Sequence, residues 1–195
     1  TAAPEILLTV YKDDATAFNA QKRGQIKGKG EINCQITAAL FDWLGSKDIP
    51  THYLDCPEPN QMRVKAVTIV PIEVVVRNIA AGSLCRQTGL PEGKILATPL
   101  VEYYYKSDEL GDPLLTRDRI FLLDLVTAER LAEIEEMARE INQNLQTFFD
   151  KCNITLVDFK LEFGIDHKKN LLLADEISPD TCRLWDKDQE DPQSR

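Results

Sequence analysis

The sequence predicts an α+β fold, and three patterns support that prediction. Residues 127–150 repeat an apolar side chain every three or four positions, which is the period of an amphipathic helix. Residues 154–163 alternate between apolar and charged side chains, as a half-buried strand does. A turn near 166–170 leads to a second apolar run at 171–177, so the two runs predict an antiparallel hairpin. Helices and antiparallel strands are therefore expected in one chain.

The composition is that of a globular protein, and it argues against several classes. The chain has 195 residues, of which 43% are hydrophobic, and this suffices for one good core or two small lobes that share a cleft. Its 23 Lys and Arg against 32 Asp and Glu give a net charge of -9, which disfavours nonspecific binding to nucleic acid or an anionic membrane. No apolar run approaches the roughly 20 residues of a membrane span, and the first residues lack the order of a signal peptide. We therefore expect a cytoplasmic protein.

Several common functional motifs do not occur in the sequence. The five cysteines are scattered and include no C-x-x-C pair, which favours reduced thiols over a disulfide framework or a zinc site. Neither the P-loop pattern nor the glycine fingerprint of dinucleotide-binding folds is present. His52 and His167 have no Ser or Cys in a recognisable nucleophile setting, so we expect both to be incidental surface residues.

The N-terminal quarter is expected to contain a strand, a loop and a helix. Residues 5–11 are apolar and β-branched enough to form a strand. The basic, glycine-bearing residues 22–30 are expected to form a mobile, solvated loop. Residues 31–44 have apolar positions at helical spacing, namely Ile32, Ile36, Leu40, Phe41 and Leu44.

The next β-rich runs, 64–69 and 72–76, are separated by Pro71. Because proline cannot donate a ladder hydrogen bond, it predicts an edge or a crossing between lobes. The run 74–76 is apolar on both faces and predicts a strand covered on both sides. Further along, Thr127 is expected to cap the helix at 127–150. The apolar stripe of that helix consists of Leu131, Ile134, Ala138, Ile141, Leu145 and Phe148.

Three charged side chains, Asp158, Lys160 and Glu162, share one face of the predicted hairpin. They could form the solvated face of an antiparallel sheet. Alternatively, the return strand brings Asp175 towards Glu162, and the two carboxylates converge on a divalent cation. Mg²⁺ is commonly held by one or two carboxylates together with substrate phosphates. Lys160 would then lie near the same anions.

Arg77 and Ser83 bracket a turn of small residues directly after the predicted buried strand. A guanidinium and the donors of such a turn suit a phosphate or a carboxylate, and ligands often bind where strands end. A tight turn with a structural salt bridge would explain the same residues. The segment after the hairpin adds a further acid and a further base, Asp180 and Arg183.

Six strings are long or distinctive enough to carry a family resemblance. They are KDDATAFN (12–19), IKGKG (26–30), VVVRNIAAGSL (74–84), YKSDELGDP (105–113), LVDFKLEFG (156–164) and LADEISPDTCRLWD (173–186). In this order they closely resemble the SAICAR synthetase family in its monofunctional microbial form. The resemblance covers essentially the whole chain as far as Asp186.

The resemblance implies an ATP-dependent ligase of purine biosynthesis that uses Mg²⁺. Its substrates would be ATP, L-aspartate and carboxyaminoimidazole ribonucleotide (CAIR), and its products SAICAR, ADP and phosphate. The implied fold has two α+β lobes with mainly antiparallel sheets and an ATP cleft between them, and is related to ATP-grasp and kinase-like folds. Family members are often homo-oligomers, and the resemblance implies no nucleic-acid or membrane partner.

Carried over position by position, the resemblance assigns roles to individual residues. Glu162 and Asp175 match the Mg²⁺ ligands, and Lys160 matches a lysine at the reacting phosphates. Asp158 matches an acid near the imidazole, so Lys160 and Asp158 are the expected catalytic residues. The expected contacts to CAIR and aspartate are Arg77, Ser83, Lys106, Asp112, Asp180 and Arg183. The expected contacts to ATP are Lys65, Ile69, Val70 and Lys160.

The resemblance also divides the chain into an N-terminal ATP-binding lobe, residues 1–70, and a C-terminal lobe, residues 71–195, with the CAIR and metal sites. The first lobe is expected to lack the family's opening strands and phosphate turn, and the second its last helical segment. Two alternatives stay open. One is a phosphotransferase or another ATP-dependent ligase built on the same lobes, and the other is a nucleotide-binding module without turnover.

Overall fold

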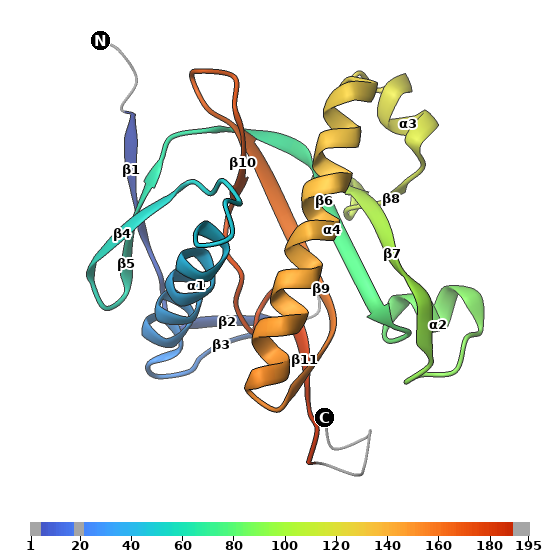
Figure 1. Ribbon diagram of the computed structural model, residues 1–195, viewed down its shortest axis with the longest axis horizontal. Helices are drawn as coiled ribbons and strands as arrows, with labels where there is room; N and C mark the ends of the chain where they lie inside the picture. The colour runs from blue at the N-terminus through green and yellow to red at the C-terminus, as the bar shows by residue number, and fades with distance from the viewer. Residues whose placement is uncertain (1–4, 18–21, 189–195) are drawn as a thin grey trace.

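The computed structural model describes residues 5–17 and 22–188 and is dominated by one antiparallel sheet (Figure 1). The strand order is β10-β9-β6-β7-β8, and β11 pairs with the other end of β9. The bounds of these strands are β6 Thr68–Ile79, β7 Ile95–Tyr105, β8 Leu114–Leu115, β9 Ile154–Ile165, β10 Leu171–Ala174 and β11 Cys182–Asp186. Every pairing in this sheet is antiparallel, which confirms the predicted fold class.

A smaller sheet and a helix form the N-terminal part of the structure. Its strand order is β1-β5-β4, and α1 packs against β4 and β5. A two-stranded ribbon, β2–β3, precedes α1. The bounds are β1 Ile6–Val10, β2 Asp14–Ala17, β3 Lys22–Gln25, α1 Lys29–Gly45, β4 Tyr53–Glu58 and β5 Gln61–Lys65.

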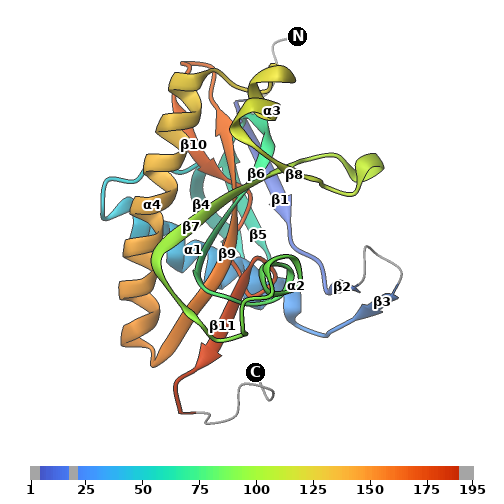
Figure 2. The same cartoon turned by 90° about the vertical axis from the view of Figure 1, so that its right-hand side faces the viewer.

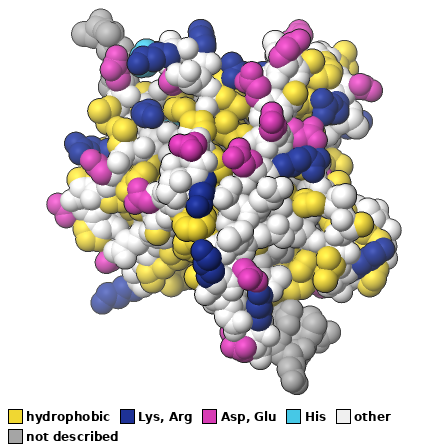
Figure 3. Space-filling view, in the orientation of Figure 1, with side chains coloured by type: hydrophobic (Ala, Val, Ile, Leu, Met, Phe, Trp, Pro, Cys, Tyr) yellow, Lys and Arg dark blue, Asp and Glu magenta, His cyan; other side chains and the backbone are white. Residues whose placement is uncertain are grey.

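The long helix α4, Ala128–Lys151, covers one side of the large sheet, while β1 and the ribbon lie towards the other (Figure 2). The remaining elements are short and connect the strands: α2 Ser83–Thr88, the 3-10 turn η1 Asp108–Leu110 and α3 Arg117–Leu122. No helix among the described residues is long and apolar enough to cross a membrane. Figure 3 shows basic and acidic side chains interspersed on one face of the molecule.

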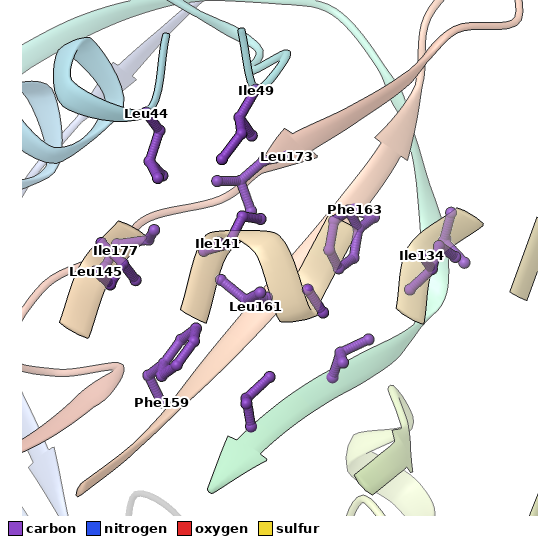
Figure 4. Close-up of a cluster of buried hydrophobic side chains, with 14 of the residues drawn as sticks. Leu44, Ile49, Ile134, Ile141, Leu145, Phe159, Leu161, Phe163, Leu173 and Ile177 are labelled. Carbon is purple, nitrogen blue, oxygen red and sulfur yellow. The ribbon is translucent and has the colours of Figure 1, made fainter. Parts of the chain in front are cut away.

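The main core lies between α4 and the large sheet (Figure 4). The predicted stripe of α4 is confirmed from Leu131 to Leu145, although Phe149 is buried in place of the half-buried Phe148. Thr127 caps the helix as predicted, because its hydroxyl accepts a hydrogen bond from the Arg130 amide at 3.2 Å. Burying each of these Leu and Ile side chains contributes roughly 1.5–3 kcal/mol.

A short extended segment, residues 50–52, joins the two sheets. The Leu173 amide donates to the Pro50 carbonyl at 2.9 Å, and the His52 amide donates to the Leu173 carbonyl at 2.8 Å. On the other side, the Lys65 amide at the end of β5 donates to the His52 carbonyl at 2.7 Å. The main chain of His52 is therefore hydrogen-bonded to both sheets. These bonds fix the position of the small sheet relative to the large sheet.

The expectation that Pro71 separates two runs and marks an edge is wrong, because β6 lies between β9 and β7 in the sheet; a crossing between lobes stays a prediction. β6 runs through Pro71 from Thr68 to Ile79, and the pairing with β9 changes register between Ile69 and Glu73. The register change accommodates a residue without an N–H, while the Pro71 carbonyl still accepts from the Lys106 amide at 3.2 Å. The run 74–76 is also not covered equally on both faces, because Val74 and Val76 are buried in the core and Val75 is only half-buried.

Two predictions for the basic stretch and the following helix need correction. The stretch at 22–30 is only partly a loop, because Lys22–Gln25 forms β3 and α1 begins at Lys29. The helix at 31–44 is confirmed, but Ile32 is 55% exposed, while the polar Asn33 and Thr37 are buried. The reason is that this part of α1 faces polar partners, since the Thr37 hydroxyl donates to the Ile177 carbonyl at 3.1 Å.

Candidate active site

One face of the large sheet carries a row of charged side chains. Phe159, Leu161 and Phe163 of β9 pack into the core under α4, so Asp158, Lys160 and Glu162 face the opposite side. This face is not a solvated surface, because Asp158 is 7% exposed and Glu162 is 4% exposed. Buried charges must be paired, and strand β6 supplies partners: Arg77 lies opposite Asp158 and pairs with it, and Glu73 pairs with Lys160.

Lys160 lies at the centre of a cluster of carboxylates. Its Nζ lies 2.8 Å from Glu162 Oε1, 2.9 Å from Glu73 Oε1 and 3.9 Å from Asp175 Oδ2. Lys106 adds a second ammonium, 2.7 Å from Glu162 Oε1. The hairpin brings Asp175 here as predicted, since Ala174 pairs with Glu162 and Asp175 follows it.

The pKa values in this cluster reflect its crowding. Burial alone would lower the pKa of Lys160, but hydrogen bonds to Glu162 and Glu73 raise it, so the ammonium stays charged. Burial would likewise raise the pKa of Glu162, yet Lys106 and Lys160 hold it below its usual value. Asp175 has less compensation, and burial together with the Glu162 charge raises its pKa to about 6. The site holds more negative charge than its two ammonium groups stabilise.

The carboxylates suit a divalent cation that shares its coordination with a ligand. Glu162 and Asp175 line the same cavity, and beside them Glu176 Oε2 is buried without a hydrogen-bond partner. Among residues 5–17 and 22–188 there is no group of three or more His, Cys, Asp or Glu side chains placed to hold a metal on their own. Mg²⁺ is usually coordinated by one or two carboxylates, with phosphate oxygens and water completing the coordination. The residues present therefore fit Mg²⁺ as a partner of phosphate.

These side chains open into a cavity of about 650 Å³ between the two sheets. The small sheet contributes β1 and β5, α1 contributes its first residues, and the large sheet contributes Lys106, Glu162 and Asp175. The volume lies within the range of roughly 300–1,000 Å³ typical of small-molecule sites. Val64, Val67 and Ile69 form an apolar part of its wall, and Lys106, Glu162 and Asp175 form a charged part. The cavity can therefore receive a ligand with an apolar end and an anionic end.

The start of α1 contacts the loop that follows the hairpin. Lys29 forms an ion pair with Asp180, and the buried Asn33 donates to the same carboxylate at 2.9 Å. Asp13 holds this helix start in place by accepting from the Gly28 and Gly30 amides, each at 3.0 Å. Gly30 is required here because a Cβ would lie 2.8 Å from the Tyr11 carbonyl oxygen. The glycines and lysines of 26–30 thus build a contact between distant parts of the chain.

A second polar cluster surrounds Arg77, further along the same face. Its guanidinium donates to Glu102 Oε2 at 2.7 Å, Asp158 Oδ2 at 2.9 Å, Ser83 Oγ at 3.0 Å and Tyr104 OH at 3.2 Å. With the residue only 5% exposed and all three guanidinium nitrogens engaged, Arg77 is committed to its protein partners. The structure shows salt bridges of Arg77 to Glu102 and Asp158, and the ligand contact expected for Arg77 stays a prediction.

Arg183 is the accessible cation of that cluster. Strand β11, which sequence patterns did not predict, pairs Arg183 with Asp158, and Arg183 Nη1 lies 3.1 Å from Asp158 Oδ2. Its side chain is 37% exposed, so part of its guanidinium remains available to a ligand. Gly82 makes room for it, because a Cβ there would lie 2.5 Å from Arg183 Nη2. Ser83 lies in the same turn as Gly82, at the start of α2.

The other expected ligand contacts fall in different places. Lys65 and Ile69 line the cavity, but the Val70 side chain is buried in the core, where a ligand does not reach it. Asp112 accepts from the Ser107 amide at 2.9 Å, so it shapes the loop after Lys106. The expectation for His52 is wrong, because this histidine is buried and lines the cavity.

Four partners in the site were not anticipated from the sequence. Lys29 and Asn33 hold Asp180, while Glu73 and Glu102 pair with Lys160 and Arg77. The available signal for the two glutamates is their position on neighbouring strands, Glu73 on β6 beside β9 and Glu102 on β7 beside β6, but strand order was not readable from the sequence. Lys29 was visible within a basic stretch, whose charge alone suggested a solvated loop.

Comparison with known proteins supplies close relatives. A family model described as SAICAR synthetase matches residues 1–195. Proteins named phosphoribosylaminoimidazole-succinocarboxamide synthase from Synechocystis sp. and Nostoc punctiforme are each 65% identical over all of this chain, which covers 74% and 80% of their lengths. A solved SAICAR synthetase in complex with ADP matches with a TM-score of 0.94 at 42% identity, over 98% of this chain and 82% of that one. The SAICAR synthetase of Pyrococcus horikoshii matches with a TM-score of 0.92 at 43% identity, over 97% and 84%.

Proposed function

The chain belongs to the SAICAR synthetase family, and from that premise we propose how its residues carry out the family's reaction. It is an ATP-dependent ligase of purine biosynthesis that joins L-aspartate to the carboxylate of CAIR, giving SAICAR, ADP and phosphate. Three anionic substrates must therefore meet on an acidic protein. The roles of individual residues, of Mg²⁺ and of the two lobes are our proposals.

The cavity between the sheets is the proposed ATP site. Its apolar wall, with Ile69 and the nearby Lys65, would receive the adenine end, and the main chain at Val70 rather than its side chain would face the nucleotide. The charged wall would receive the phosphates. This assignment gives residues 1–70 the nucleotide-binding role and residues 71–195 the CAIR and metal sites, with β6 running across the boundary.

Glu162 and Asp175 are the proposed Mg²⁺ ligands, with phosphate oxygens completing the coordination. When bound, the ion would neutralise phosphate charge and stabilise the charge that develops on transfer. Lys160 and Lys106, both hydrogen-bonded to Glu162, would contribute positive charge at the same phosphates. Their positions are set before the substrate binds, so little reorganisation is needed during the reaction.

Arg183 and Ser83 are the proposed contacts to the phosphate of CAIR. We propose that Arg77 acts differently from what the resemblance implies: because four of its five N–H groups already donate to protein partners, it would hold Asp158 and Ser83 in position rather than contact the phosphate. Asp158 lies between the two arginines and would orient the substrate's amine. Asp180, fixed by Lys29 and Asn33, brings a further acid between the two sites.

The reaction requires activation of a poor electrophile. We propose that a carboxylate oxygen of CAIR attacks the γ-phosphorus of ATP, the bond to ADP breaks, and an acyl phosphate forms. The amine of aspartate then attacks the acyl carbon, loses a proton, and phosphate leaves with the original carboxylate oxygen. With CAIR labelled by ¹⁸O in its carboxylate, the label should appear in inorganic phosphate, and its absence there would exclude this route.

One observation carries the proposal: Glu162, Asp175 and Lys106 line the cavity, Lys160 is hydrogen-bonded to Glu162, and the same sheet face continues to Asp158 and Arg183. The test measures ADP release with ATP, Mg²⁺, aspartate and CAIR, omitting each in turn. Release only with all four supports the ligase assignment. Sustained release, over many turnovers, with one of aspartate and CAIR omitted would indicate a phosphotransferase acting on the other, and Mg²⁺-dependent ADP binding without any turnover would indicate a binding module.

We further propose a cytoplasmic enzyme that works on small metabolites alone. All three substrates are small anions, and the net charge of -9 disfavours nucleic acid as a partner. Association of two or more copies is the expectation that the resemblance adds. Light scattering of the purified protein measures it directly.

A further inference from the structure

His52 lies against the cavity, and its ring contacts the main chain of Asp175. The residue is 7% exposed, and Nε2 lies 3.1 Å from the Asp175 carbonyl oxygen. A carbonyl oxygen only accepts, so Nε2 must carry the hydrogen in this contact. The ring also packs edge-on against Phe41, with 5.7 Å between ring centroids. These two contacts fix both the orientation of the ring and the atom that donates.

Asp175 has an unusual backbone conformation. Strand β10 ends at Ala174, and Asp175 follows with a φ of 57°, in the left-handed region. For a residue with a Cβ this conformation costs about 1 kcal/mol or more, so it persists where neighbouring contacts hold it. The conformation matters because it places the Asp175 carboxylate 3.9 Å from Lys160, on the side of Glu162.

The main chain of His52 provides a rigid support for its ring. Its amide and carbonyl are hydrogen-bonded to Leu173 in the large sheet and Lys65 in the small sheet. Asp175 lies two residues after Leu173, which the His52 main chain contacts. The His52 ring therefore holds Asp175 in place relative to both sheets. A side chain free in solvent could not give the same precision.

We propose that His52 is a positioning residue for Asp175. By donating Nε2–H to the Asp175 carbonyl, it holds the left-handed conformation that directs the carboxylate towards Glu162. This inference rests on the proposed role of Asp175 as an Mg²⁺ ligand. His52 itself touches the metal ligand's main chain, and acts on the ion only through that contact. Loss of such a supporting hydrogen bond typically weakens metal affinity by roughly 10–100-fold.

The experiment compares variants that remove or keep the donor. His52→Phe keeps the ring packing on Phe41 and removes Nε2–H, whereas His52→Gln supplies an amide N–H near the same place. His167→Gln, in the exposed turn after β9, is the matched control. Mn²⁺ binding to each protein with ADP is measured by electron paramagnetic resonance, alongside the Mg²⁺ dependence of ADP release and the KM for aspartate.

We expect His52→Phe to weaken Mn²⁺ binding about 10-fold and to raise the half-saturating Mg²⁺ concentration by the same factor, with the KM for aspartate unchanged. His52→Gln should recover binding to within about threefold of wild type, and His167→Gln should match wild type. If His52→Phe fails to fold, His52→Asn replaces it, because its shorter side chain cannot reach the carbonyl.

Asp175→Asn separates the two proposals. If Asp175→Asn weakens Mn²⁺ binding but His52→Phe does not, His52 is not a positioning residue and the metal role of Asp175 stands. If Asp175→Asn binds Mn²⁺ like wild type, the metal role of Asp175 is wrong, and the inference for His52 falls with it. Equal weakening by His52→Phe and His52→Gln, without rescue, would also overturn the inference.

Discussion

Arg77 and Asp158 face each other on paired strands, with Arg77 Nη1 2.9 Å from Asp158 Oδ2 and neither side chain more than 10% exposed. Arg183 Nη1 lies 3.1 Å from the same oxygen. One carboxylate thus serves two guanidinium groups, one buried and one partly accessible. Asp158 therefore links the stability of the sheet, through Arg77, to the substrate contact that we propose for Arg183.

Removing this carboxylate should destabilise the fold. We expect Asp158→Ala to lower the free energy of unfolding by about 3–5 kcal/mol, because Arg77 stays buried with Glu102 as its one remaining acidic partner. Asp55→Ala is the control, since Asp55 pairs with Arg63 where both side chains are about half exposed. That change should cost less than about 1 kcal/mol. Urea unfolding measures both, and similar costs would contradict the structural role of Asp158.

Gly82 should matter for CAIR because of the space it leaves for Arg183. A Cβ at Gly82 would lie 2.5 Å from Arg183 Nη2, and the flexible arginine would move away. We expect Gly82→Ala to raise the KM for CAIR by roughly 10-fold or more, as loss of a charge-assisted hydrogen bond does. Gly89→Ala is a partial control: Gly89 also has a positive φ, 74°, but its ψ of 7° lies in the left-handed helical region, and a Cβ there meets open space. Gly82, with a φ of 56° and a ψ of -124°, is more strained with a Cβ, so Gly82→Ala should lose more stability than Gly89→Ala. A rise in KM for CAIR in Gly89→Ala as large as in Gly82→Ala would contradict the role of the Arg183 contact.

Lys160 should be required for turnover more than for substrate binding. We expect Lys160→Met to lower kcat about 100-fold or more, because a preorganised charge at the reacting phosphates is lost. The KM for CAIR should change little, since Arg183 and Ser83 are untouched. Lys168→Met, in the exposed turn of the same hairpin, is the control and should behave like wild type. An unchanged kcat in Lys160→Met, measured well below its melting temperature, would remove this lysine from the mechanism.

The sequence predicted what depends on local periodicity. The helix at 127–150, its Thr127 cap and the hairpin that brings Asp175 to Glu162 all follow from spacing within one short segment. The partners of Lys160 and Arg77 did not follow, because Glu73 and Glu102 reach them through strand order over a large separation in sequence. The prediction at Pro71 failed for a related reason. A register change in the pairing with β9 lets the strand continue, and the local sequence does not show that change.

The role of His52 depended on the same long-range information. In the sequence it is one of two isolated histidines, and only the junction between β5 and β10 places it against the cavity. Burial then changes its chemistry. The pKa of His52 is lowered to about 4, mainly because burial disfavours the imidazolium, with a smaller contribution from the Lys65 charge.

The lowered pKa of His52 predicts a loss of stability in acid. An unfolded histidine takes up its proton near pH 6.5 and the native one near pH 4, so the unfolded state gains protons first as the pH falls. The contribution of His52 is therefore complete above pH 6.5 and decreases by roughly 3 kcal/mol on reaching pH 4. Asp175, whose pKa is raised to about 6, acts in the opposite direction, but it is present in both proteins when wild type is compared with His52→Gln. Urea unfolding in EDTA should show the stability advantage of wild type over His52→Gln shrinking between pH 7 and pH 4, and a constant difference would mean that His52 titrates normally in the folded protein.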